Sequence, residues 1–511
     1  MRGVIESLRG VERKGVLLMA GALVVAALGV WSVWPQREAP ARPSAGAGGS
    51  AHEVVVATVG ERAVYFSDVS RAFALEPAWT RGQRRFEAYE AQLDQLVADR
   101  LLAQEARRRG LDTLAWAAGR LAFIESKEVL RELYRRDVLA GVELTEQEYA
   151  EAYARSKRRV RLHYVRTAVE ARADAYAEGL RGGSFEDLEV VDAERDEKGT
   201  TEWLGFGGVA EELEAVVFQL EPGDVAGPID VEGDYYVVML AEGEVDRFTS
   251  EYDFAQQRGQ IRRVLTERRA RPLAAAYVAD AMAGQRVRLD REGFAALGAA
   301  LLRVIPDLDP GTPLTPEVVR LVEQELPLTG SETVVTYAGG AMTAREVLNE
   351  LSYLPSSLLR PGRPLAPQLR DAVAVLVRNR VLAARGRALE LEALPHVRRE
   401  VQAQQDAFMA DLLRRLERDS IDVTPEEVAS FRASTTFEEA NRRAGGGLDE
   451  ARLAEVIRDY RSAAWEVSLV ERLQKAVPVE VDEGRLRAEI RDPDALLDHA
   501  PTPVIVREVF Q

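Results

Sequence analysis

The chain has 511 residues, enough for three or more domains, and 46% hydrophobic with 30% charged residues is ordinary for a soluble, helix-rich protein. A net charge of -17 argues against nucleic acid as a partner, because a nucleic-acid binder neutralises phosphates with a basic surface. The absence of cysteine excludes disulfides, thiolate metal sites and a lipid-modified cysteine. The histidines are isolated along the chain, so the sequence predicts no metal site and no cofactor.

The N-terminus predicts a membrane anchor. Residues 1–14 are basic, and residues 15–34 contain no charge, which is enough for a helix of about 30 Å that crosses a bilayer. Trp31 and Trp34 stand where an interfacial aromatic belt is expected, so we favour an uncleaved single-pass anchor over a cleaved signal peptide. The positive-inside rule then places the bulk of the chain outside the cytoplasm, beyond a flexible Pro/Ala/Gly/Ser-rich linker at residues 35–52.

Residues 53–156 predict a short strand segment followed by helices. Val54–Phe66 alternates in the manner of a strand with a turn in its middle, and Ser67 is a suitable helix N-cap. Thr145 and Glu148 form the pattern of a capping box. Apolar periodicity and these start signals predict helices at residues 67–76, 83–109, 115–139 and 146–156.

The pattern changes from helical to mixed over residues 157–246. RVRLHYV, from Arg159, alternates as a strand, and a helix is expected to follow it as far as Leu180. GGSFEDL, from Gly182, predicts the start of a short second helix. A further helix ending in AVVF and a closing strand DYYVVML, from Asp234, complete the segment.

Helical character returns after this segment. Residues 247–304 predict a long closing helix, kinked at Pro272, and residues 305–330 form a proline-rich linker. Residues 331–487 are helical again. The tail at residues 488–511 contains PVIVREVF, which suits a strand that pairs either with its own module or with a partner.

A repeat underlies the helical parts of the chain. Three segments recur in one order at nearly one spacing, which points to duplication rather than to shared composition. The pairs are Leu96–Leu111 with Leu376–Leu391 at 280 residues, Thr58–Val69 with Thr336–Val347 at 278, and the segments from Glu143 and Asp422 at 279.

The closing segments recur at a shorter spacing. Val278–Phe294 matches Val470–Leu486 at only 192 residues, so the second copy lacks 87 residues (279 minus 192) at the position of the mixed segment. We therefore expect a mainly α protein with two copies of one helical module. An α+β domain is expected to be inserted into the first copy.

The inserted segment resembles the parvulin-type prolyl isomerases. The resemblance is carried by Arg161–His163, by GGSF from Gly182, by KGTTEWLGFG from Lys198, and by DYYVV from Asp234. The most specific part is VFQLEPGDVAGPI, from Val217. With the anchor and the flanking helices, the whole resembles the periplasmic SurA, PpiD and PrsA class of chaperone-isomerases, in which such helices form an apolar cradle.

The resemblance implies a set of site residues. His163, Asp192 and Tyr236 take the catalytic positions, with Tyr236 where the family has a second histidine. Val209, Leu213 and Phe218 are assigned to the proline pocket, with Val209 and Leu213 in place of the family's Met and Phe. These departures predict a weak or inactive isomerase used for binding or spacing.

Three functions follow as hypotheses. The first is a chaperone, anchored in the inner membrane with its bulk in the periplasm, that binds unfolded or nascent exported proteins. The second is an active prolyl isomerase. The third is a scaffold of an envelope complex. The sequence names neither the clients nor the oligomeric state.

Overall fold

The computed structural model describes residues 54–75, 84–192, 195–231, 233–246, 251–304, 316–326, 332–354, 365–433 and 449–495. The predicted anchor, the linker after it and the strand predicted near residues 503–510 lie outside these described residues. Among the helices within the described ranges, none combines the length and the apolar character needed to span a bilayer.

The first helical copy follows the predicted order of elements. A β-hairpin leads into long antiparallel helices, and Thr145 caps the last of them by accepting a hydrogen bond from the Glu148 backbone N–H. The elements are β1 (Val55–Val59), β2 (Arg62–Tyr65), α3 (Phe66–Leu75), α4 (Arg85–Arg108), η2 (Leu111–Thr113), α5 (Ala115–Asp137), η3 (Leu139–Gly141) and α6 (Glu146–Ser156).

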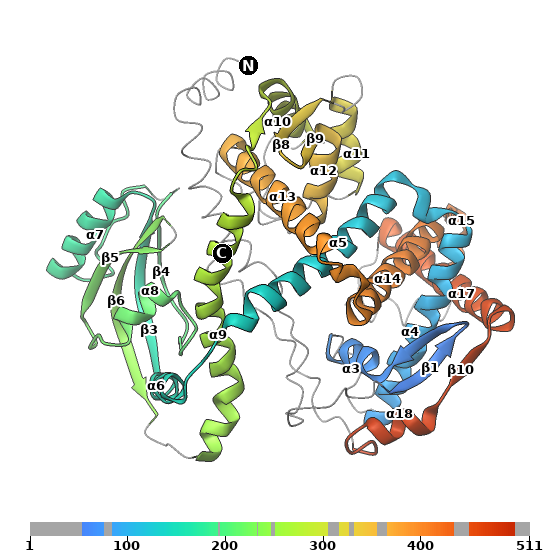
Figure 1. The fold of residues 1–511 in the computed structure, drawn as a ribbon, viewed down its shortest axis with the longest axis horizontal. Helices are drawn as coiled ribbons and strands as arrows, with labels where there is room; N and C mark the ends of the chain where they lie inside the picture. Colours follow the sequence, from blue (N-terminus) through green and yellow to red (C-terminus); the bar gives the residue numbers. More distant parts are fainter. Residues whose placement is uncertain are drawn as a thin grey trace.

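The inserted domain is a four-stranded antiparallel sheet with one helix on each face. The strand order is β4-β3-β6-β5, and the domain stands apart from the helical copies except along α6 and α9 (Figure 1). Its elements are β3 (Arg158–Thr167), α7 (Glu170–Gly182), β4 (Glu197–Thr200), α8 (Glu211–Val217), β5 (Val225–Val231) and β6 (Asp234–Val245).

The short helix predicted from GGSFEDL is a turn instead. Residues 185–187 are turn residues, and the Asp187 backbone N–H donates to Ser184 Oγ at 3.2 Å. A serine that bonds its neighbouring backbone offers the chain an alternative to helix, and here that alternative wins.

The second copy repeats the first after a long connection. The connection is α9 (Glu251–Met282), β7 (Arg288–Leu289), α10 (Arg291–Val304) and α11 (Pro316–Glu325), and α9 continues through Pro272. The copy itself is β8 (Thr333–Tyr337), β9 (Gly340–Thr343), α12 (Ala344–Tyr353), α13 (Leu365–Ala388), η5 (Leu391–Ala393), α14 (Pro395–Asp419), α15 (Pro425–Arg432), α17 (Glu450–Ala476), β10 (Val479–Val481) and α18 (Glu483–Glu489).

The two copies exchange their closing segments. β10 pairs antiparallel with β1, and Leu486 of α18 is buried against the same hairpin. Reciprocally, β7 pairs with β8, and Leu297 of α10 is buried against the second hairpin. The structure thus differs from the expectation that each closing segment completes the copy it follows. The physical reason is that the two closing segments are alike in sequence, so either hairpin accepts either strand.

The long helices pair across the copies in the same way. α4 packs along α14, and α5 packs along α13, in the body to the right of α9 in Figure 1. Leu102 and Ala106 of α4 are buried with Met409 of α14, and Val129 of α5 is buried with Leu382 of α13. Each fully buried aliphatic side chain contributes roughly 1.5–3 kcal/mol, so these shared cores join the two copies into one body.

Candidate functional site

The α8 face of the inserted domain gathers most of the predicted pocket residues. Leu213, Phe218 and Tyr236 share one core with the strand residues Leu162 and Val238, and Val209 packs against its edge. Leu213, Phe218 and Tyr236 are at most 8% exposed. They therefore fill the face of the sheet themselves, as core residues do.

Tyr236 points its hydroxyl group toward a cation. Arg166, its partner in the register of β3 and β6, hydrogen-bonds the phenol. Burial raises the pKa of Tyr236 above its usual value, so the phenol stays protonated at neutral pH. It is a neutral hydrogen-bonding group, held by Arg166 at the end of the apolar core.

His163 lies on the opposite face of the sheet. Its ring stacks on Phe185 with ring centroids 4.3 Å apart, and its Nδ1 is 2.8 Å from Thr200 Oγ1. Phe185 belongs to the core beneath α7. Since neighbouring residues of a strand point to opposite faces, the β3 residue beside the Tyr236 core is Leu162, and His163 and Tyr236 are not brought together.

Asp192 is held by α7. Arg172 Nη1 lies 3.0 Å from Asp192 Oδ2, and the same guanidinium lies 3.1 Å from Asp196 Oδ1. Tyr176 donates to Asp196 Oδ2 at 2.6 Å. Asp192 thus belongs to a charged network that fastens the acidic loop to α7, and the three predicted catalytic residues do not form one cluster.

The inserted domain is clamped to α9 beside its α8 helix. Arg268 of α9 makes two hydrogen bonds, of 2.9 and 2.7 Å, to the buried carboxylate of Glu214. The Gly207 backbone N–H also donates to this carboxylate, at 2.7 Å. Phe206 is buried against Ile261 of α9, and the guanidinium of Arg268 lies 5.0 Å from its ring centroid.

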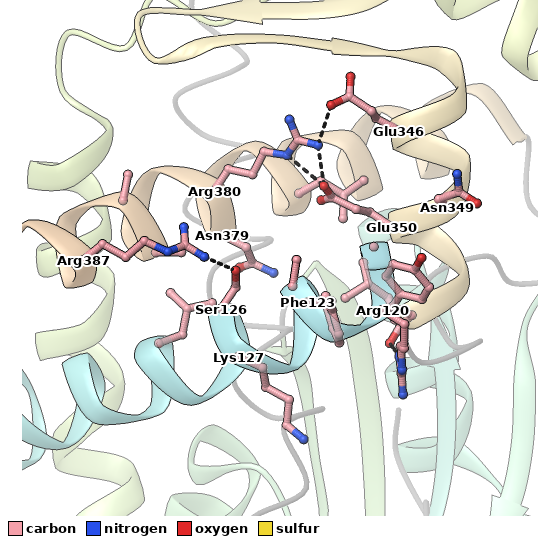
Figure 2. A pocket seen from close by; sticks show the side chains of 18 of the residues that line it. Arg120, Phe123, Ser126, Lys127, Glu346, Asn349, Glu350, Asn379, Arg380 and Arg387 are labelled. Carbon is pink, nitrogen blue, oxygen red and sulfur yellow. Dashed lines mark hydrogen bonds and ion pairs between the residues drawn. The ribbon is translucent and has the colours of Figure 1, made fainter. Parts of the chain in front are cut away.

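A groove of about 850 Å³ lies between the two copies. It is bounded by α5 of the first copy and by α12 and α13 of the second (Figure 2). Apolar and aromatic side chains share its lining with several charged ones. Among them are Phe123, Leu130, Tyr353, Leu354, Leu376, Arg120, Lys127, Glu346, Glu350, Arg380 and Arg387.

Two arginines of α13, Arg380 and Arg387, line the side of the groove opposite α5. Figure 2 shows Arg380 reaching from α13 to Glu346 and Glu350 of α12, with Arg380 Nε to Glu350 Oε1 at 2.8 Å. Arg387 Nη2 donates to Ser126 Oγ of α5 at 2.7 Å. The bonds of Arg380 join α13 to α12 within the second copy. The bond between Arg387 and Ser126 joins the second copy to the first.

The family resemblance predicted an apolar cradle formed by the helices, but not which residues would line a groove between the copies. Arg380 and Arg387 were visible as matches of Arg100 and Arg107 in the repeat, but their recurrence did not reveal a shared cavity. The groove exists only because α5 packs along α13, a pairing that the sequence pattern leaves open.

Comparison with known proteins places one part of the chain. A search of curated proteins finds no match. Residues 144–248 match the family model of the PPIC-type PPIASE domain, which includes β3 to β6 and α6 to α8. This segment is therefore a parvulin-type prolyl isomerase domain, carried by a helical protein of two interlocked copies.

Proposed function

We propose that the chain is a folding chaperone that binds unfolded segments of exported proteins in the groove between its two copies. The main observation that supports this proposal is the groove between the copies. Its volume of about 850 Å³ and its aromatic and aliphatic lining suit side chains that a folded client would bury. The charged run at residues 1–14 and the apolar run at 15–34 favour a membrane anchor with the bulk in the periplasm.

An aggregation assay tests the chaperone role. The full chain is expected to suppress aggregation of a chemically unfolded client, and Phe123→Ala to weaken suppression because it removes an aromatic surface of the groove. Tyr460→Ala is the matched control, since Tyr460 is 61% exposed on α17 and does not line the groove. Suppression that fails in the wild type would favour the scaffold hypothesis. Equal loss in both variants would exclude the groove.

The parvulin-type domain is proposed to be a weak isomerase or a binding domain. The observations behind this are the filled α8 face and the placement of His163 on the other face. Catalysis needs an apolar pocket that grips the proline ring and stabilises the twisted amide.

The isomerase activity of the domain is measured directly as the cis/trans isomerisation rate of X-Pro peptides in the presence of the full chain. Spontaneous cis/trans isomerisation of an X-Pro bond takes tens to hundreds of seconds. We expect the rate in the presence of the chain to be within about twofold of this spontaneous rate. His163→Ala should leave that rate unchanged. A rate far above the spontaneous one that falls in Tyr236→Phe would instead establish the active isomerase.

A further inference from the structure

Helix α5 is flanked by two hollows that share three of its residues. The groove against α12 and α13 and a second hollow of about 670 Å³ against α14 are both lined by Arg120, Phe123 and Lys127. Figure 2 shows Arg120 and Lys127 extending from α5 on the side away from Arg380. The two cations are seven residues apart, which is about 10 Å along a helix, with Phe123 between them.

The carboxylates that line the two hollows are already paired with other arginines. In the groove, Glu346 and Glu350 are bound to Arg380. In the second hollow, Asp99 lies 2.6 Å from Arg414, and Asp411 lies 2.8 Å from Arg415.

Arg120 and Lys127 are the cations left over. Within the described residues, no carboxylate lies at ion-pair distance from Arg120. Lys127 Nζ donates to the neutral amide of Gln404 at 3.0 Å, and its closest carboxylate contact is 3.8 Å, to Glu128, which Arg131 holds at 2.6 Å. The hollows therefore carry surplus positive charge inside a chain whose net charge is -17.

Arg120 is held in place by aromatic rings. Its guanidinium lies 5.3 Å from the ring centroids of both Phe123 and Tyr353. Tyr353 approaches closely because position 119 is glycine. A Cβ at Gly119 would lie 2.8 Å from the Tyr353 hydroxyl oxygen. A guanidinium fixed against rings is preorganised, with N–H groups available for a planar anion.

The pair of helices α4 and α14 corresponds, through the repeat, to the pair α13 and α5 that bounds the groove. Around the α4–α14 pair, the charges at the corresponding positions are neutralised. At the repeat spacing of 280, Arg120 corresponds to Glu400, and at 278, Asn349 corresponds to Arg71. Arg71 and Glu400 form an ion pair between the copies. Where α3 and α14 have this ion pair, the corresponding positions on α12 and α5 are an uncharged amide, Asn349, and a cation, Arg120.

At a second position the carboxylate is placed differently. Ser126 corresponds to Asp406, and Arg387 corresponds to Arg107. Arg107 lies 2.7 Å from the buried carboxylate of Asp406, whereas Arg387 donates to the neutral hydroxyl of Ser126 and pairs at 3.3 Å with Glu125, which does not line the groove. At the first position the groove lining has no carboxylate in place of Glu400, whereas at the second the carboxylate that pairs with Arg387 belongs to Glu125, one residue before the position of Asp406.

We infer that Arg120 and Lys127 receive carboxylates of the bound polypeptide. The occupant is an unfolded segment in which acidic side chains, or an acidic side chain and the C-terminus, flank an aromatic or aliphatic side chain that packs on Phe123. This inference rests on the proposed function and adds the class of segment selected. Burial lowers the pKa of both Arg120 and Lys127, an electrostatic cost that a bound carboxylate reduces.

Peptide binding to the full chain tests the inference. One labelled peptide carries two aspartates three positions apart, a span of about 10 Å in an extended chain, with a phenylalanine between them and an amidated C-terminus. A second peptide replaces both aspartates with asparagine. A third keeps one aspartate and ends, at the position of the other, in a residue with a free C-terminal carboxylate. The first and third are expected to bind about tenfold more tightly than the second, and added salt should reduce the difference.

Substitutions then locate the preference. Arg120→Gln with Lys127→Gln should abolish the preference, so that the acidic and asparagine peptides bind the variant with affinities within about twofold of each other. Ser126→Asp, which recreates the Asp406 position beside Arg387, should also weaken the acidic peptides. The control is Arg136→Gln, which removes one positive charge from α5 at an exposed side chain outside the hollows. It should retain the full preference.

The outcomes separate this inference from the proposed function. Equal affinity for all peptides, with aggregation still suppressed, would overturn the carboxylate preference and leave the chaperone intact. A preference that survives the double substitution would place the anion site elsewhere. If neither peptides nor clients bind, both proposals fail. Dimerisation that the double substitution abolishes would make a second copy of the chain the occupant and overturn the inference.

Discussion

Nearly buried carboxylates in this chain are held by arginines. Glu105 of α4 is 5% exposed and accepts hydrogen bonds from Arg108 at 2.6 Å and from Arg109 at 2.8 Å. Glu214 is held in the same way by Arg268 across the boundary between the parvulin-type domain and α9. A buried carboxylate left without such a partner is costly, so these arginines stabilise the folded chain.

Glu105 predicts a measurable acid dependence of stability. Hydrogen bonds from Arg108, and then from Arg109, outweigh burial and lower the pKa of Glu105 from 4.5 to about 2. Because the folded-state pKa is the lower one, this stabilisation is fully present above about pH 4.5 and is lost as the pH falls toward 2.

The comparison of wild type with Glu105→Gln isolates that contribution. The variant is expected to melt at a lower temperature at pH 7, and the difference between the two melting temperatures should shrink steadily below about pH 4.5. Thermal unfolding monitored by circular dichroism across this range measures it. A difference that is constant with pH would show that Glu105 does not titrate with a depressed pKa.

The predicted site residues show what a sequence pattern does and does not decide at this scale. Leu213 and Phe218 were assigned to the proline pocket and Tyr236 to catalysis, and the three share one core. His163 was assigned to the same site and lies on the α7 face. A strand alternates its side chains with a period of two, so an offset of one residue moves a side chain to the other side of the sheet.

At the scale of elements, helix packing depends on single small residues. Gly386 of α13 faces α5, and a Cβ at this position would lie 2.3 Å from Val129 Cγ1. The corresponding residue of the first copy is Ala106, which packs against α14. The two long-helix pairs therefore cannot be superposed side chain for side chain.

Gly386→Ala is expected to destabilise the chain. Alanine favours helix by about 1 kcal/mol over glycine, but the overlap with Val129 requires a shift that costs typically 1–3 kcal/mol. Gly259→Ala in α9 is the control, since a Cβ there meets nothing within 4 Å, and it should be neutral or stabilising. Urea unfolding of both variants measures the difference. A stabilised Gly386→Ala would show that α5 and α13 are less closely packed.

Local signals predicted most elements well. The helices expected at residues 67–76, 83–109, 115–139 and 146–156 occur as α3 to α6 with nearly the same bounds. A turn at Ser184 stands where a helix was predicted, because Ser184 Oγ accepts a hydrogen bond from the Asp187 backbone N–H. Composition alone does not reveal this local bond.

At the scale of the whole molecule, the exchanged closing segments make each hairpin depend on a distant part of the chain. Leu486 of α18 is fully buried against the β1 hairpin. Leu297 of α10 is fully buried against the β8 hairpin. Each segment therefore stabilises strands that belong to the other copy.

Two substitutions test this reciprocity. Leu486→Ala and Leu297→Ala should each cost roughly 2–5 kcal/mol, the usual range for emptying a buried leucine site. Hydrogen exchange should show lost protection in β1 and β2 for Leu486→Ala, and in β8 and β9 for Leu297→Ala. Loss confined to the hairpin of the substituted segment's own copy would contradict the exchange.

The sequence by itself determined the elements, the repeat and the parvulin-type segment, because helix caps, apolar periods and a turn-rich motif are local properties of the chain. Only the tertiary structure decided which hairpin each closing strand joins, which face His163 occupies, and that α5 and α13 enclose a groove lined by Arg120 and Lys127. These are choices between partners far apart in sequence. Two similar copies offer similar partners, so local patterns cannot distinguish them, and only packing of the whole chain does.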